Sequence, residues 1–259
     1  AGTGRYTDDV RPEGQAQLVF QRSPYPHARI VAVDAEAARG MPGVRAVYTG
    51  ADLVAAGVKP VPGVAGFKRA DGSDAATAPR HVLAHERVRF VGEPVVAVVA
   101  DTLQQARDAA EAVMVEYDAL PMVVALADAI APGAPALCEA APDNISAEMR
   151  HGNAEAAAAA FAQAAHVVKL DVINQRVAAV TIEPRSVLGE VDAQTGRLTL
   201  RMSTQMPSGV RNTLCDAILG IPREQVRVVV GDVGGGFGMK TGIYPEDAAV
   251  AFAARALKR

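Results

Sequence analysis

Alternating and continuous apolar positions in the first half of the chain predict a β-rich unit that also contains helices. A short helix is expected at residues 35–39, and a second helix is expected to begin at Asp101, whose side chain would cap it. Strands are expected at residues 17–20, 28–33, 44–48, 88–100 (a pair interrupted by Gly92-Glu93-Pro94) and 113–117. The pattern therefore predicts an α+β unit that closes near residue 120.

Two stretches without hydrophobic periodicity interrupt this pattern. Residues 57–79 are rich in glycine, proline and aspartate and predict a long surface loop. Residues 128–144 contain several prolines and predict a linker between domains. The expected organisation is a first domain at 1–127, a linker at 128–144 and a second domain at 145–259.

The second half of the chain predicts a second mixed unit. Asn153 is a good N-cap for an alanine-rich helix that reaches Ala165, and Gln194-Thr195-Gly196 predicts a hairpin turn. Strands are expected at 166–173, 187–192, 198–203 and 225–230, and helices at 206–219 and from Pro245 onward. The order of elements again indicates an α+β fold.

Composition and charge exclude several classes of protein. Half of the 259 residues are apolar, and 26 basic residues stand against 29 acidic ones without clustering, so the chain lacks the basic surface of a nucleic-acid-binding protein. The longest apolar runs, such as 95–100, are far too short to span a membrane. Cys138 and Cys215 have no zinc-type spacing, which favours reduced thiols and a cytoplasmic location. Neither terminus has the features of a complete chain, so we expect a fragment of a longer protein.

The most informative segment runs from Gly231 to Thr241 and follows a predicted strand. Four glycines surround Phe237 and leave backbone N–H groups unshielded, which predicts a cradle for the oxygen atoms of a ligand. A tight turn between strand and helix is the plain alternative. The dinucleotide fingerprint fails, because Met239 stands where its last glycine is needed. The phosphate-loop pattern fails only at the same residue, so a P-loop-like nucleotide-binding protein stays open as an alternative.

Other candidate residues carry weaker signals. His81 and His85 have helical i,i+4 spacing, but no third ligand accompanies them, and their surroundings favour strand and loop, so no protein-bound metal is expected. Glu183, before Pro184, is either a buried acid near a pocket or a brace for its strand. We assign it no catalytic role.

Several motifs together resemble one family. The string Gly234-Gly235-Gly236-Phe237-Gly238-x-Lys240, preceded by Ser203-Thr204-Gln205 and Glu183-Pro184-Arg185, is similar to the molybdenum-binding large subunit of the xanthine dehydrogenase, aldehyde oxidase and carbon monoxide dehydrogenase family. Arg22-Ser23-Pro24, His27-Ala28-Arg29-Ile30 and Arg89-Phe90-Val91-Gly92-Glu93-Pro94-Val95 look like the α/β hammerhead domain of that family. The resemblance implies an α/β hammerhead domain followed by the first part of a molybdenum cofactor-binding domain.

The resemblance also implies a cofactor and its site. The cofactor would be molybdenum bound to molybdopterin, with the cytosine dinucleotide form as one candidate, and no side chain need coordinate the metal. Gln205 would donate its amide to an oxo group on the molybdenum, and the main chain of Gly235, Gly236, Phe237 and Gly238 would lie against the cofactor. No catalytic residue is expected in this chain, because the general-base glutamate of the family would lie beyond Arg259.

The implied activity is that of a molybdenum hydroxylase, which oxidises a small substrate with oxygen from water and passes electrons to FAD and 2Fe-2S partner subunits. Thr241 stands where purine-oxidising members carry a carboxylate, which favours an aldehyde or another small substrate. The expected partners are the remainder of the large subunit and the two redox subunits, and the fragment alone is expected to be inactive. A non-catalytic scaffold subunit that retains the fold is a further alternative.

Overall fold

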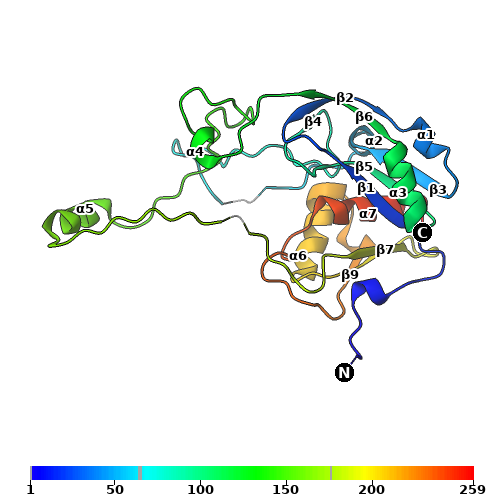
Figure 1. The fold of residues 1–259 in the computed structure, drawn as a ribbon. Helices are drawn as coiled ribbons and strands as arrows, with labels where there is room; N and C mark the ends of the chain where they lie inside the picture. Colours follow the sequence, from blue (N-terminus) through cyan, green and yellow to red (C-terminus); the bar gives the residue numbers. More distant parts are fainter. Residues whose placement is uncertain (1, 64–65, 176) are drawn as a thin grey trace.

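A computed structural model describes residues 2–63, 66–175 and 177–259 (Figure 1). The chain forms two packed units, each with helices and sheets, and a long arm that extends away from them. This arrangement confirms the predicted α+β class. No helix within the described ranges is long and apolar enough to cross a membrane.

The first sheet of the N-terminal unit is built around one fully buried strand. This central strand, β5 (Pro94–Ala100), pairs antiparallel with β1 (Gln17–Arg22) on one side and β3 (Val44–Thr49) on the other. Its continuous apolar sequence suits a strand that is covered on both faces. Helix α3 (Leu103–Ala112) packs against β1 and β5.

The start of α3 corrects one prediction. Thr102, not Asp101, is the N-cap: its side chain and that of Gln105 form a capping box. Asp101 instead accepts two hydrogen bonds of 2.7 Å from the Arg45 guanidinium. The prediction of Asp101 as the cap was wrong because its carboxylate binds Arg45 instead of the N–H groups at the start of the helix.

The second sheet has strand order β4-β2-β6, and all its pairings are antiparallel. Its strands are β4 (Arg87–Val88), β2 (Ala28–Asp34) and β6 (Met114–Ala119). The apolar run predicted as a strand pair at 88–100 is therefore divided between the two sheets. Short helices α1 (Glu36–Arg39) and α2 (Gly50–Ala55) flank β3, and a 3-10 turn lies at Thr7–Asp9.

The C-terminal unit carries the third sheet, in which β7 (Val187–Val191) and β8 (Leu198–Met202) form the predicted hairpin. Strand β9 (Val226–Val229) lies parallel to β8, and helix α7 (Pro245–Leu257) packs on β7. The segment predicted as one helix at 206–219 divides into α6 (Pro207–Asn212) and a π-helical stretch at Thr213–Leu219. A 3-10 turn at Arg223–Gln225 leads into β9.

One hydrophobic core joins the two units. Ala97 of β5 lies in the same buried cluster as Leu200 of β8 and Ala251 of α7. At the edge of this cluster, the rings of Tyr48 and Phe252 meet edge to face with centroids 5.2 Å apart. The C-terminal unit is therefore held on the N-terminal sheet by apolar packing, which fixes the position of the loops at its edge.

The two long irregular segments lie against each other. Residues 57–79 are irregular, as predicted, although residues 64–65 lie outside the described part of the chain. Residues 128–144 begin within the last turn of helix α4 (Leu126–Ala129), and Arg69 binds Asp143 through two hydrogen bonds of 2.9 and 3.0 Å. The division into 1–127, 128–144 and 145–259 stays a prediction.

The arm comprises residues 147–175 and 177–182 and carries helix α5 (Ala154–Gln163) near its far end (Figure 1). The strand predicted at 166–173 is wrong: these residues are extended, and no strand within the described ranges pairs with them. Their apolar side chains are exposed, including Val168, Leu170 and Ile173. Hydrophobic pattern alone predicted a strand, but a strand also needs a neighbour that supplies hydrogen bonds.

Candidate functional site

A glycine-rich loop leads from β9 to α7 and has an unusual backbone. Gly235, Phe237 and Gly238 adopt the left-handed conformation, with φ values of 100°, 47° and 84°. This conformation costs a residue with a side chain about 1–3 kcal/mol, and it persists only where the surroundings enforce it. The Phe237 side chain is nevertheless 79% exposed, so burial of its ring does not offset that cost.

This backbone leaves a run of donors without internal acceptors. No described residue accepts a hydrogen bond from the N–H groups of Gly235, Gly236 or Phe237. The flanking N–H groups of Gly234 and Gly238 each donate to a side chain. Successive N–H groups in such a turn form a concave site for an anion or for the oxygen atoms of a ligand.

Gln205 lies directly against this loop, just beyond β8. Its side-chain Oε1 accepts hydrogen bonds from the N–H groups of Gly238, at 3.1 Å, and Lys240, at 3.3 Å. A backbone N–H can only donate, so the atom that faces the loop is the oxygen, and the amide NH₂ points elsewhere. No described residue accepts from this NH₂ group, which leaves it available to a ligand.

The approach of Gln205 to the loop requires a glycine at position 236. A Cβ atom placed on Gly236 would lie 2.4 Å from the Gln205 Cδ atom. Gly234 has a similar constraint, because a Cβ there would lie 2.5 Å from the Glu183 Cβ. The glycines therefore let the loop pass close to two side chains.

A buried ion pair anchors the loop from beneath. The Lys240 side chain is fully buried, and its Nζ donates to the Glu183 carboxylate at 3.0 Å and to the Glu183 carbonyl at 2.8 Å. The same carboxylate oxygen accepts from the Ser203 hydroxyl at 2.6 Å and from the Gly234 N–H at 2.8 Å. Glu183 thus ties β8 and both ends of the loop together.

The surroundings of Glu183 keep it ionised. Burial alone would raise its pKa, but the hydrogen bonds from Ser203, Gly234 and Lys240 and the charge of Lys240 together hold the pKa below its usual value. Its second oxygen, Oε1, is buried and receives no hydrogen bond from any described residue. Of the two roles considered for Glu183, the bracing role matches this geometry.

A second set of contacts links the loop to the N-terminal unit. The Tyr244 hydroxyl donates to the Met239 carbonyl at 2.6 Å, and the Arg185 guanidinium lies 3.6 Å from the centre of the Tyr244 ring. Arg185 also pairs with Glu246 at 3.7 Å, and Glu246 accepts from Arg22 of β1 at 2.9 Å. The loop is therefore held on the N-terminal unit through the first turn of α7.

Asp247 in that turn is the acid whose pKa is most strongly raised. Burial raises its pKa to about 6, although its carboxylate accepts the Tyr244 N–H at 2.9 Å and the Arg185 charge opposes the rise. The folded protein therefore holds a proton on Asp247 at pH values where the unfolded chain has lost it. Consequently, this residue stabilises the fold below about pH 4, and that stability is lost as the pH rises to about 6.

We expect Asp247→Asn to remove this pH dependence. The difference in free energy of unfolding between wild type and Asp247→Asn should change by about 2–3 kcal/mol from pH 4 to pH 7, because the pKa is raised from 3.8 to about 6 and each pKa unit corresponds to 1.36 kcal/mol. Denaturant titrations across this range measure the difference, with Glu155→Gln on α5 as the exposed control. A constant difference across the range would show that Asp247 titrates normally.

The structure brings the expected site residues together, but they differ in the contacts that they make. Gln205, Gly236 and Gly238 are in direct contact, and Gly235 lies beside the Phe237 ring and Thr181. Neither the burial of Lys240 nor its pairing with Glu183 was predicted from the sequence. A lysine is seldom fully buried, so the sequence around Lys240 gave no signal of this pairing.

The remaining candidates do not form a site of this kind. His81 and His85 lie outside helices, as expected, with ring centroids 5.8 Å apart. Within the described part of the chain, no three His, Cys, Asp or Glu residues are grouped to hold a metal ion. In a phosphate loop, the lysine reaches the bound phosphate, whereas the Lys240 ammonium is buried against Glu183, so the geometry does not fit that alternative.

Family comparisons match both halves of the chain. Residues 137–259 match the molybdopterin cofactor-binding domain, and residues 1–121 match the aldehyde oxidase and xanthine dehydrogenase a/b hammerhead domain. The chain is 37% identical to the nicotine 6-hydroxylase large subunit of Paenarthrobacter nicotinovorans and to the carbon monoxide dehydrogenase large chain of Hydrogenophaga pseudoflava, over 99% and 94% of its length. It spans about 30% of the length of each of these relatives.

Solved structures agree with the family matches. Quinoline 2-oxidoreductase from Pseudomonas putida 86 superimposes with a TM-score of 0.82 at 34% identity, covering 100% of this chain and 32% of the other. Carbon monoxide dehydrogenase from Oligotropha carboxidovorans superimposes with a TM-score of 0.86 at 34% identity, covering 99% of this chain and 32% of the other. The predicted order of the two domains is confirmed.

Proposed function

Because the chain belongs to the family of molybdopterin-binding large subunits of xanthine dehydrogenase, aldehyde oxidase and carbon monoxide dehydrogenase, we propose that its glycine loop and Gln205 bind the molybdenum cofactor of an oxidoreductase. One observation carries this proposal. Three consecutive N–H groups without described acceptors lie beside a carboxamide whose NH₂ group is also available. This donor set suits a cofactor that presents polar ligands and needs no side chain to coordinate its metal.

We assign the residues the following roles. Gln205 donates its amide to the cofactor, while the main chain of Gly235, Gly236, Phe237 and Gly238 lies against it. Lys240 and Glu183 hold the loop in the conformation that presents these donors. When bound, the cofactor supplies two-electron redox chemistry and transfers an oxygen atom that comes from water.

The substrate proposal rests on Thr241. Its hydroxyl donates to the Gly238 carbonyl at 2.8 Å, so this position offers no carboxylate to the hydrogen-bonding edge of a purine. We propose an aldehyde or another small molecule as substrate. The named relatives act on nicotine, quinoline and carbon monoxide, which fits the same preference for small molecules.

The proposed partners follow from the membership of the chain in this family. The relatives are about three times as long as the matched region, so we propose that further polypeptide completes the cofactor site and supplies the general-base glutamate. FAD and 2Fe-2S subunits would accept the electrons, and the cytosine dinucleotide is the proposed form of the cofactor. A scaffold subunit without cofactor would instead show no change in visible absorbance on addition of substrate.

We expect Gln205→Ala to lower turnover by about a hundredfold or more, as the loss of one preorganised donor does in other enzymes. The fold should be retained, because Gln205 is exposed and only its Oε1 bonds to the loop are lost. Steady-state kinetics of the assembled enzyme and its molybdenum content measure the effect. Gln194→Ala in the β7–β8 turn is the matched control, and unchanged kinetics in Gln205→Ala would remove the assigned role.

A further inference from the structure

A cavity of about 670 Å³ lies in the N-terminal unit, away from the glycine loop. It is lined by residues 29–30 of β2, by Arg87 of β4, by side chains from the segments before and after β4, and by the turn at residues 137–140. The volume falls within the range of pockets that hold small molecules. Nothing in the proposed cofactor chemistry uses this cavity.

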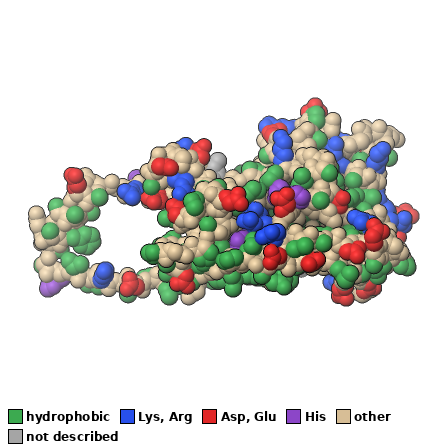
Figure 2. All heavy atoms as spheres, turned by 90° about the horizontal axis from the view of Figure 1, so that it is seen from above, with side chains coloured by type: hydrophobic (Ala, Val, Ile, Leu, Met, Phe, Trp, Pro, Cys, Tyr) green, Lys and Arg blue, Asp and Glu red, His purple; other side chains and the backbone are tan. Residues whose placement is uncertain are grey.

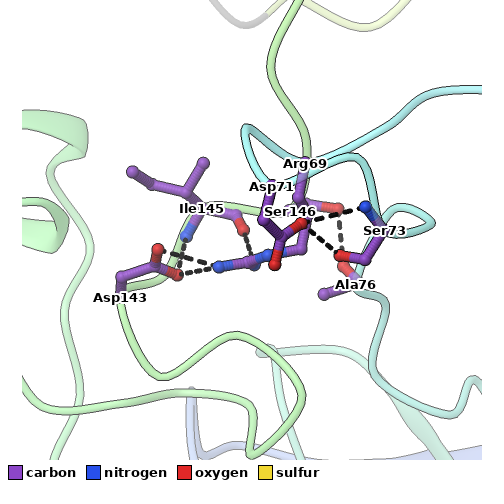
Figure 3. A network of polar contacts seen from close by, with 7 residues as sticks. All are labelled: Arg69, Asp71, Ser73, Ala76, Asp143, Ile145 and Ser146. Carbon is purple, nitrogen blue, oxygen red and sulfur yellow. Dashed lines mark hydrogen bonds and ion pairs between the residues drawn. The ribbon is translucent and has the colours of Figure 1, made fainter.

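The wall at 137–140 is fixed by hydrogen bonds from both sides. Asn144, which adopts a positive φ of 58°, accepts the Leu137 N–H at 2.9 Å and donates to the Ala129 and Pro135 carbonyls. Figure 3 shows how the following residues are held: Arg69 bonds to the Asp143 carboxylate and to the Ile145 carbonyl. Hydrogen bonds therefore hold this side of the cavity in place.

The lining of this cavity is rich in side chains that donate hydrogen bonds. Arg29, Arg87, Arg89 and the imidazoles of His81 and His85 all line it. Figure 2 shows basic and histidine side chains gathered near the middle of the face seen from above. Five hydrogen-bond-donating side chains of this kind in one cavity are typical of recognition of an oxyanion.

The nearby acidic side chains make only weak contacts with the arginine and histidine side chains that line the cavity. Glu86 and Glu139 also line the cavity, but their side chains are 81% and 93% exposed, and their contacts with His85 and Arg87 are long, at 3.5 and 3.8 Å. The buried Glu93 already accepts the Arg89 backbone N–H at 2.6 Å. Exposed and distant pairs of this kind contribute little.

The remaining contacts of the basic side chains are weak. The Arg89 guanidinium makes one hydrogen bond within the described part of the chain, to the Arg87 carbonyl at 3.5 Å. Arg29 pairs with Asp118 at 3.5 Å, with both side chains more than half exposed. The guanidinium groups are therefore available to a ligand at little cost.

The surroundings of His81 lower its pKa. Burial lowers its pKa, and the neighbouring His85 and Arg89 lower it further, against a smaller opposite effect of Glu86. An anion between these side chains would relieve that repulsion. The imidazoles supply N–H donors even when neutral.

We propose that this cavity binds a small molecule through a phosphate group, with Arg87, Arg89 and Arg29 as its main ligands and His81 and His85 as additional donors. The arginine fork matches phosphate geometry, and the cavity leaves room for the rest of a phosphorylated molecule. The proposal concerns a site separate from the cofactor site and does not depend on the cofactor.

Calorimetric titration of the assembled, cofactor-loaded enzyme with inorganic phosphate tests the proposal directly. At constant ionic strength, we expect saturable binding at one site, and Arg89→Gln should weaken it about tenfold or more, because a charge-assisted hydrogen bond is lost. Arg150→Gln on the exposed arm is the matched control and should bind phosphate like the wild type. A thermal melt without phosphate checks that Arg89→Gln is folded, and Arg29→Gln provides a second test if it is not.

Two results would overturn the proposal. The first is the absence of saturable phosphate binding to the folded wild type. The second is equal affinity in wild type, Arg89→Gln and Arg29→Gln, which would place the phosphate elsewhere. A phosphate monoester that binds more tightly than inorganic phosphate would further support a phosphorylated small molecule.

Discussion

We expect replacement of Gly236 by alanine to lower turnover of the assembled enzyme by a factor of about 10² to 10³, the effect of losing a preorganised donor. The added Cβ would lie 2.4 Å from the Gln205 Cδ and 2.5 Å from its Oε1, closer than atoms can pack. Gln205 must therefore move, and its hydrogen bonds to the Gly238 and Lys240 N–H groups break. The free NH₂ group then loses its fixed direction.

Gly242→Ala is the matched control for this experiment. It adds the same methyl group to the same loop, but no atom lies within 4 Å of the new Cβ. Steady-state kinetics and molybdenum content of both variants, compared with wild type, separate loss of the donor from general damage to the loop. Equal activity of Gly236→Ala and Gly242→Ala would show that the contact with Gln205 has no functional role.

Replacing Lys240 by methionine destabilises the fold by about 3–5 kcal/mol, because it leaves the Glu183 carboxylate buried without its counter-charge. For a chain of this size, we expect the melting temperature to fall by about 10 °C. Lys59→Met, at an exposed position, should change it little. Thermal melts and denaturant titrations measure both variants.

A second substitution isolates the electrostatic part of this effect. Glu183→Gln in the Lys240→Met background removes the uncompensated charge and should recover much of the lost stability. The Ser203 and Gly234 donors can still bond to the glutamine oxygen. If the double variant is as unstable as the sum of the two single variants, the two residues do not act as a pair.

The fold could be predicted from sequence where pattern and packing agree. Val95 to Ala100 is continuously apolar, and this strand is buried on both faces. The same reasoning failed at Val168 and Leu170, whose apolar side chains are exposed on the arm. Hydrophobic periodicity indicates which residues favour burial, but it does not predict which segment will pack over them.

Only part of the candidate site could be predicted from the sequence. Glycine spacing indicated a loop with accessible N–H groups, and the family resemblance indicated Gln205. That the Gln205 oxygen faces the loop, and that Lys240 is buried against Glu183, depends on contacts between residues far apart in sequence. No local pattern contains such contacts, so the structure was needed to assign them.

A crystal structure of the purified assembly with its molybdenum cofactor tests most directly whether the glycine loop and Gln205 bind that cofactor. We expect the Gln205 Nε2 and the N–H groups of Gly236 and Phe237 to lie within hydrogen-bond distance of the cofactor. A cofactor bound away from this loop, or a Gln205 NH₂ group turned away from the cofactor, would show that these residues do not form its site.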